Sequence, residues 1–324
     1  MSTPSPISSF LGGLGLPFAT HALTLLNGSV FGISGFLHRA ARGNKEAMAG
    51  VAGLIIGGLV VGLTEGAGPR VFPMSYLRII LSGLLVGVGT KMGNGCTSGH
   101  MICGISRLSV RSITATAVFF STGVIGARFS PESVLVPSQP FDWSLGPTGT
   151  TLLALQIIPF TVSVLLYILA PRQPTDKSQP ALPIPRLIAS LATSLEFAFA
   201  LRLSNLTEPI KVLTFLLLPF NAAFDPSLSF LAVGALPLAI VLYQFARGPE
   251  QPRLGGTWSV PKGGKVDLRL IIGAALFGIG WGSGGICPGP ALVNLGRAIS
   301  GGSDPLPMIT WLSAVLLGGA VAEL

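Results

Sequence analysis

GNGCTSGH, at residues 93–100, ends one long apolar segment of this chain, and GGICPGP, at residues 284–290, ends another. Shifting the sequence by 191 positions places three glycines and a cysteine of the first segment on the same residue types in the second. The coinciding pairs are Gly87 and Gly278, Gly89 and Gly280, Gly93 and Gly284, and Cys96 and Cys287. A pattern that recurs at a fixed offset indicates an internal duplication.

The composition around these stretches is that of a membrane protein. Of 324 residues, 49% are hydrophobic and 10% are charged, and the mean hydropathy is +0.70. An ordinary soluble domain has roughly 25% charged residues. The net charge of +8 comes from Lys and Arg residues that stand singly in loops between apolar segments. We therefore interpret the basic character as a signal of membrane topology, with the lipid bilayer as partner and no nucleic acid.

The sequence predicts an all-α polytopic membrane protein with about nine transmembrane helices, because a helix needs about 20 apolar residues to cross the bilayer. Residues 208–220 and the stretches after the two glycine-rich motifs are too short to cross, so we expect re-entrant half-helices there. The predicted spans are residues 20–38, 47–64, 76–96, 110–128, 150–170, 186–203, 228–246, 270–287 and 306–321.

A proline-rich polar linker at residues 171–185 divides the chain into a first repeat, residues 1–170, and a second repeat, residues 186–324. Five spans precede the linker, so the second repeat would insert with opposite polarity. Basic residues near the span ends place the linker and the loop 247–269 together in the cytoplasm. Residues 1–9 resemble neither a signal peptide nor a transit peptide. We expect a multi-pass protein of the cell membrane.

The two cysteine motifs carry the predicted site. A helix that begins after Cys96 or Cys287 would point its positive dipole end at the glycine-rich turn, which favours an anion. A thiol is a soft, weak donor that suits contact with another sulfur atom. Two thiols approached from opposite membrane faces would offer a sulfur-bearing anion successive weak contacts. The three cysteines cannot all pair, and we expect neither a disulfide framework nor a metal site or cofactor.

Other residues of these motifs complete the predicted substrate-binding set. Its members are Cys96, Cys287, Cys103, His100, Thr97, Ser98, Gly95, Gly99, Lys91, Pro288 and Gly289. His100 either holds backbone carbonyls or contacts the anion, and Lys91 either attracts a dianion or extends to the surface beside Arg107 and Arg111. Cys103 has no cysteine counterpart in the second motif and is expected mainly to pack.

Glu196 lies inside a predicted span, where a charge is costly. It is either a functional residue or the partner of Arg202 on the same helix.

Residues 83–112, with GNGCTSGH and CGISRLS, resemble the YeeE/YedE sulfur-transport family, and residues 278–293, with GIGWG and CPGPALV, resemble a related segment often encoded separately. The resemblance implies thiosulfate uptake through an hourglass-shaped protein, with both halves fused in one chain. Central cysteines would relay the ion by S–H to sulfur contacts, and Cys96 and Cys287 match two of the relay positions. A third cysteine expected in the first span is absent, since residues 32–35 read GISG. A soluble sulfur-carrier protein is an expected partner.

The sequence leaves one rival function open. A membrane-embedded sulfurtransferase would form a persulfide on a cysteine activated by a neighbouring base, and His100 is close to Cys96 in sequence. We expect a transporter and not an enzyme, and we find no nucleotide-binding loop that would couple it to ATP.

Overall fold

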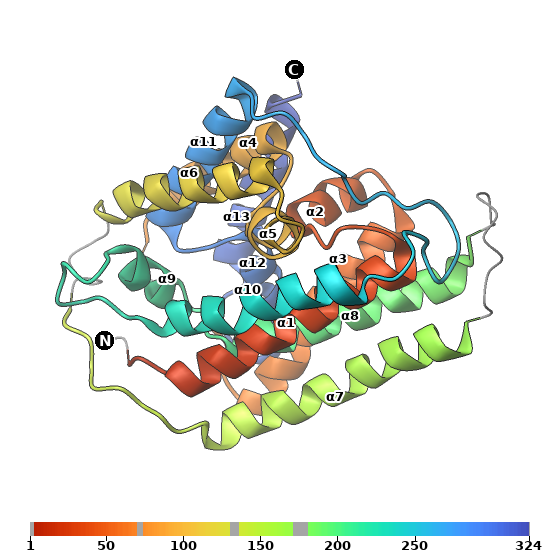
Figure 1. Ribbon diagram of the computed structural model, residues 1–324. Coiled ribbons are helices and arrows are strands. Elements are labelled where there is room, and N and C mark those ends of the chain that lie inside the picture. The colour runs from red at the N-terminus through yellow and green to blue at the C-terminus, as the bar shows by residue number, and fades with distance from the viewer. Residues whose placement is uncertain (1–2, 70–73, 130–135, 171–180, 324) are drawn as a thin grey trace.

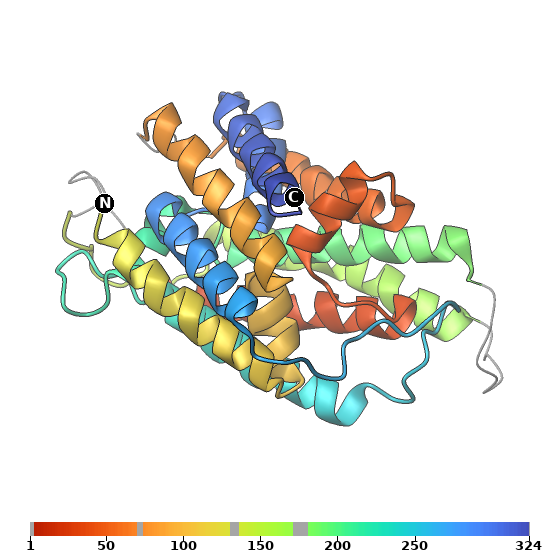
Figure 2. The ribbon, with the colours of Figure 1, turned by 90° about the horizontal axis from the view of Figure 1, so that it is seen from above.

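The computed structural model describes residues 3–69, 74–129, 136–170 and 181–323, and every regular element in these ranges is helical. The first half contains α1 (Pro6–Asn27), α2 (Ile33–Ala41), α3 (Lys45–Glu65), α4 (Tyr76–Gly93), η1 (Ser98–Ile102), α5 (Cys103–Ser106) and α6 (Val110–Ala127). After α7 (Gly146–Leu169), the second half contains α8 (Pro183–Leu203), α9 (Pro209–Leu216), α10 (Ser227–Ala246), α11 (Leu268–Gly284), α12 (Pro288–Ser300) and α13 (Leu306–Val321). Figures 1 and 2 show the arrangement from two directions.

The described helices are those of a multi-pass integral membrane protein. Eight helical stretches are long and apolar enough to cross a bilayer, and α13 is a shorter apolar helix. The predicted all-α polytopic class is therefore confirmed. The predicted short piece at residues 208–220 forms α9, whose eight residues span about 12 Å, far less than the roughly 30 Å of a bilayer core.

The first predicted span, residues 20–38, is wrong. The spanning helix is α1, which begins at Pro6 and ends at Asn27, where Gly28 adopts a left-handed φ of 65°. Several glycines in α1 are contact points: a Cβ on Gly12 would collide with the backbone of Ser204, and one on Gly13 would collide with Leu231. Close helix packing, not helix propensity, therefore explains the glycines of α1.

Equivalent helices of the two halves pack against each other in opposite directions. Residues near the start of α1 lie against the end of α8, and Asn27, at the end of α1, donates to the carbonyl of Arg186, near the start of α8, at 3.0 Å. In the α4–α11 contact, Gly93 at the end of α4 lies against Gly273 near the start of α11. A two-fold axis in the membrane plane produces such antiparallel pairs, and this is the geometry of an inverted repeat.

The repeated glycines make equivalent contacts in both halves. A Cβ on Gly87 of α4 would collide with the carbonyl oxygen of Val315 in α13, and a Cβ on Gly278 of α11 would collide with that of Phe119 in α6. Since α6 and α13 occupy matching places in the two halves, the coincidence found in the sequence corresponds to one packing contact that occurs twice.

α7 has no equivalent among the matching helices of the two halves. It lies at the edge of the molecule, along the bottom of Figure 1. Only 22% of its most apolar stretch is buried, against 67% for α8, which it covers. Its exposed side chains include Ile157, Ile158 and Leu169. This pattern is expected of a helix that faces lipid.

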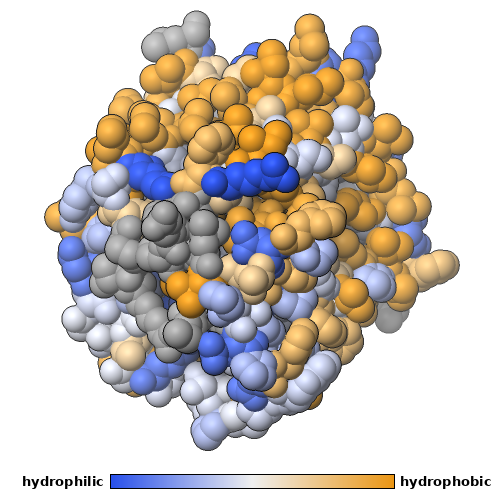
Figure 3. All heavy atoms as spheres, turned by 90° about the vertical axis from the view of Figure 1, so that its left-hand side faces the viewer, coloured by the Kyte–Doolittle hydropathy of each residue, from blue (hydrophilic) through white to orange (hydrophobic). Residues whose placement is uncertain are grey.

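The end of the predicted linker lies against the predicted cytoplasmic loop 247–269. Leu182 donates a backbone hydrogen bond to Leu254 at 3.0 Å, and Arg253 donates to the carbonyl of Ala170 at 2.8 Å. The two segments therefore lie at the same end of the protein, as the topology prediction requires; residues 171–180 lie outside the described residues. Figure 3 looks onto the opposite end, where hydrophobic residues lie along the top and right of the view and hydrophilic residues gather toward the lower left.

Candidate functional site

Each cysteine motif begins with the same helix ending. α4 ends at Gly93 and the next residue, Asn94, has a left-handed φ of 56°, while α11 ends at Gly284 and Gly285 has a φ of 64°. Asparagine and glycine are the residues that tolerate this conformation at a helix C-terminus. The chain therefore leaves both helices by equivalent left-handed turns and reaches the two cysteines in the same way.

Both cysteines stand at the start of a short helix. The carbonyl of Cys96 accepts from the N–H of His100 at 2.8 Å, and that of Cys287 accepts from the N–H of Ala291 at 3.0 Å. The helical segment after Cys96 ends at Ser106, which accepts from Gln244 near the end of α10. α12 instead runs toward the end of α3. The two short helices thus begin beside the thiols and extend to opposite ends of the bundle.

The two thiols border one small central cavity of about 20 Å³, which is room for about one water molecule. Both cysteines are only 2% exposed. The Thr97 hydroxyl donates to the Cys287 sulfur at 3.9 Å, and the Cys96 sulfur lies 3.3 Å from the Ser98 hydroxyl. The other predicted residues at this cavity are Pro288 and Gly289. We call this narrow space between the two thiols the constriction.

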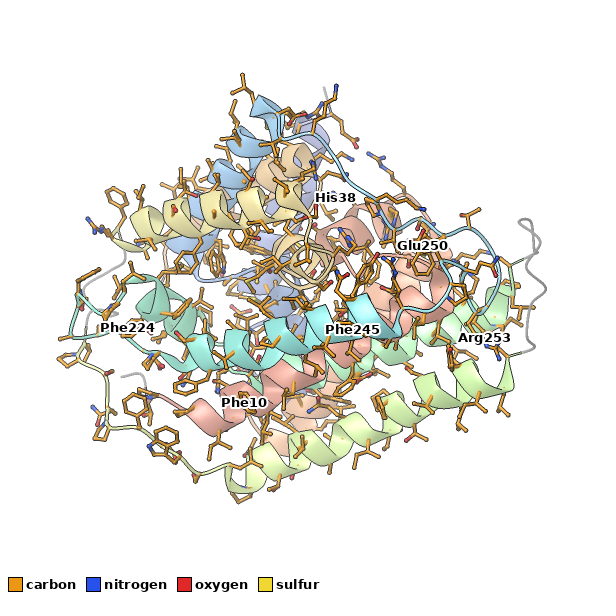
Figure 4. All side chains as sticks on the ribbon, in the orientation of Figure 1. Phe10, His38, Phe224, Phe245, Glu250 and Arg253 are labelled. Atoms are coloured by element: carbon orange, nitrogen blue, oxygen red, sulfur yellow. The ribbon has the colours of Figure 1, made fainter. Side chains whose placement is uncertain are left out.

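A much larger vestibule of about 790 Å³ lies on the side of α2, the end of α4 and the start of α6. Of the predicted residues, it is lined by Lys91, Gly95, Gly99 and His100. In the described parts of the chain, six cationic side chains line it: Arg39, Arg42, Lys91, Arg107, Arg111 and Arg186. Glu46 is the one carboxylate among the described lining residues. His38, also in this lining, is labelled in Figure 4.

His100 joins α4 to α6 through both ring nitrogens. Nδ1 lies 3.1 Å from the Ser112 hydroxyl, and Nε2 lies 3.2 Å from the carbonyl oxygen of Gly93. Arg111 donates to the same carbonyl at 2.9 Å, so it is a partly buried lining residue and not the surface residue that the sequence suggested. Of the two predicted roles of His100, the structure contains the contact with a backbone carbonyl.

Cys103 has a structural counterpart that sequence comparison missed. Its sulfur donates to the carbonyl of Phe31 at 3.7 Å, and at the matching position of the second half, Asn294 donates to the carbonyl of Thr207 at 2.7 Å. Both contacts hold the chain just before the short helix, α2 in one half and α9 in the other. The two residues are separated by the same 191 positions as the repeated cysteines, and both side chains can donate a hydrogen bond although their residue types differ. This shared property was the signal that could have identified the pair.

The predicted Glu196–Arg202 pair is wrong. Arg202, at the end of α8, lies 2.6 Å from Glu65 and 3.1 Å from Glu208, because α3 and α9 reach that end of the helix. Arg297 of α12 completes the cluster at 2.8 Å from Glu65 and 3.2 Å from Glu208. Glu196 is buried, and its Oε2 has no hydrogen-bond partner in the described parts of the chain.

Two vestibule cations are paired with a residue near the end of the chain. Glu323 forms ion pairs with both Lys91 and Arg42. Arg186 in turn is held by Glu46 at 2.7 Å. Lys91 therefore faces the vestibule with its charge partly balanced.

Known proteins match the two halves separately. The family described as "Sulphur transport" matches residues 6–125, and a family of unknown function (DUF6691) matches residues 185–324. A probable transporter of Xylella fastidiosa is 46% identical over 122 residues, which are 37% of this chain and 90% of that protein, and a second one is 34% identical over 133 residues, 41% of this chain and 86% of that protein.

A more distant relative is the thiosulfate transporter TsuA of Spirochaeta thermophila, 28% identical over 123 residues, which are 36% of each chain. No solved structure matches the chain significantly. The matched regions contain α1 to α6, apart from the end of α6, and α8 to α13, apart from the start of α8. This chain therefore belongs to the sulfur-transport (YeeE/YedE) family of membrane transporters.

Proposed function

We propose that the protein transports a small sulfur oxyanion, thiosulfate in the first place, by passing it between Cys96 and Cys287 through weak S–H to sulfur contacts. The observation that carries the proposal is the pair of equivalent thiols that border one central cavity, each at the start of a short helix. The name of the Spirochaeta relative supports thiosulfate as the substrate.

The chemistry of the cavity suits a soft anion. At the start of α12 only Gly289 has an N–H without a partner inside the helix, because Pro288 and Pro290 have no N–H and Ala291 donates to Cys287. The positive end of the helix dipole nevertheless lies at the cavity. Thiols are polarizable and donate weakly, so they attract the terminal sulfur of thiosulfate without holding it. Contacts that are weak and multiple allow an ion to enter and also to leave.

Transport requires the constriction to widen, because about 20 Å³ holds only one water molecule. The segment around Ser98 is one element that must move. Its hydroxyl accepts from the N–H of Ile33 at 3.2 Å, so it ties the short helix after Cys96 to the start of α2. Breaking this contact would let α2 and the short helix separate at the cavity.

The surroundings of Cys96 support transport over sulfurtransferase chemistry. A catalytic thiol needs a neighbouring base or cation to form the thiolate. His100 directs both ring nitrogens to Ser112 and Gly93, and the neighbour of the Cys96 sulfur is the neutral hydroxyl of Ser98. We further propose that the vestibule faces the cytoplasm of the cell, where a soluble sulfur-carrier protein would receive the product of uptake.

Uptake of radiolabelled thiosulfate into proteoliposomes tests the relay. We expect Cys96→Ala and Cys287→Ala to reduce uptake severely, and the Ser variants to fall between Cys and Ala, because a hydroxyl is a harder donor. Cys103→Ala is the matched control, since its thiol contacts a backbone carbonyl outside the central cavity. Wild-type uptake by the Cys96→Ala, Cys287→Ala double variant at matched protein levels would refute the relay. A stable persulfide on either cysteine, detected by mass, would favour the enzyme.

A further inference from the structure

The vestibule has an excess of positive charge that the fold does not use. Of its six cations, Arg186 is neutralised by Glu46, and Arg42 and Lys91 share Glu323. Arg111 is engaged by the carbonyl of Gly93. Arg39 and Arg107 remain, and neither forms an ion pair with a carboxylate in the described ranges of the chain.

The guanidinium groups of Arg39 and Arg107 are also available to bind a ligand. The Nε of Arg107 is buried and has no hydrogen-bond partner among the described residues. A buried guanidinium nitrogen without an acceptor is costly, so a ligand oxygen would be favoured there. Arg39 is exposed in the vestibule, and its guanidinium lies over the ring of Phe36, 5.4 Å from the ring centre. The ring restricts the side chain without taking up its N–H donors.

Both arginines belong to segments that begin at the constriction. Arg39 is on α2, whose first residue, Ile33, borders the central cavity, and Arg107 follows the short helix that begins after Cys96. The vestibule volume of about 790 Å³ is far larger than the roughly 30 Å³ that one water occupies in the liquid, so a hydrated anion fits. An anion in this space would be next to the thiol constriction.

We propose that Arg39 and Arg107 form a binding site for a divalent oxyanion in the vestibule, separate from the thiols. The inference rests on the proposed transport of such an anion. Guanidinium groups bind the oxygens of an oxyanion in a forked geometry, whereas thiols distinguish its sulfur. The vestibule therefore selects for charge and oxygens, and the constriction selects for a terminal sulfur atom. Sulfate in contact with the vestibule should bind there as thiosulfate does, whereas the thiols on the uptake path would let only thiosulfate through to this site.

Sulfate binding to the purified protein, measured by calorimetry, tests this site without any transport step. We expect Arg39→Gln, Arg107→Gln to weaken sulfate binding by about tenfold or more, since hydrogen bonds between charged groups are lost. Arg269→Gln removes the same charge from an exposed position outside the vestibule and should leave binding unchanged. The Cys96→Ala, Cys287→Ala variant should bind sulfate like the wild type.

Unchanged sulfate binding in the double arginine variant, or lost binding in the double cysteine variant, would overturn the proposal. If the glutamine variant does not fold, Arg39→Lys, Arg107→Lys keeps the charge without the fork and should show intermediate binding; wild-type binding would overturn the forked site. A wild-type protein that binds sulfate but never takes up thiosulfate would refute the proposed function and leave this site standing.

Discussion

Glu65 is expected to be the most sensitive charged residue for stability. It accepts from Arg202 at 2.6 Å and from Arg297 at 2.8 Å, and the side chains of Glu65 and Arg297 are only 9% and 3% exposed. Glu65→Gln preserves size but leaves two arginines to share Glu208. Breaking a buried pair costs about 3–5 kcal/mol. Arg202 and Glu208 are 18% and 19% exposed and can recover some hydration. We therefore expect the free energy of unfolding to fall by an amount near the lower end of this range, about 3 kcal/mol.

The assay is thermal unfolding of the detergent-solubilised protein, with a fall in Tm on the order of 10 °C expected. Glu250→Gln is the matched control, because Glu250 pairs with Lys262, which is 79% exposed, and should leave Tm unchanged. In an Arg297→Gln background the fall in Tm caused by Glu65→Gln should be smaller, because the buried cation is gone. A Tm for Glu65→Gln equal to that of Glu250→Gln would refute the reasoning.

Three further predictions concern single residues. Cys103→Ser should retain thiosulfate uptake and Tm, because a hydroxyl can still donate to the carbonyl that Cys103 contacts; a loss of uptake at unchanged Tm would instead assign Cys103 to the relay. Gly278→Val should lower Tm by several degrees, since its side chain would meet the backbone of α6; an unchanged Tm would contradict the glycine contact. Hydrogen bonds from Lys91 and then Arg42 hold the pKa of Glu323 below its usual value, so these contacts persist at neutral pH and are lost only as the pH falls through that lowered pKa. Glu323→Gln should therefore strengthen sulfate binding at pH 7, measured by the same calorimetry, and weaker binding would argue against the vestibule site.

The spanning helices could be predicted where the apolar pattern was continuous. The predicted span 306–321 has the bounds of α13, and the predicted span 47–64 differs from α3 by two residues at its start and one at its end. α1 could not be predicted in the same way. Its glycines and its internal Pro17 are poor helix formers in isolation, and only the contacts with α8 and α10 make them favourable.

The candidate site could also be predicted only in part from the sequence. The convergence of Cys96 and Cys287 on one cavity was predicted, because the repeat fixes both residues by symmetry. The vestibule was not predicted, since its lining comes from α2, α4, α6 and the loop around residues 257–263, which are far apart in sequence. The partner of Arg202 was missed because three different helices meet at the end of α8.

α7 has a consequence for how the protein is inserted into the membrane. It lies between the two matched regions, residues 6–125 and 185–324, and its lipid-facing surface contributes little to the interior. A single added crossing reverses the polarity of everything translated after it. If a gene for one half were joined to the other without such a segment, both halves would enter in the same orientation, and the two thiols could not approach one cavity from opposite faces. A deletion of α7 should thus yield a protein with intact halves and no shared centre.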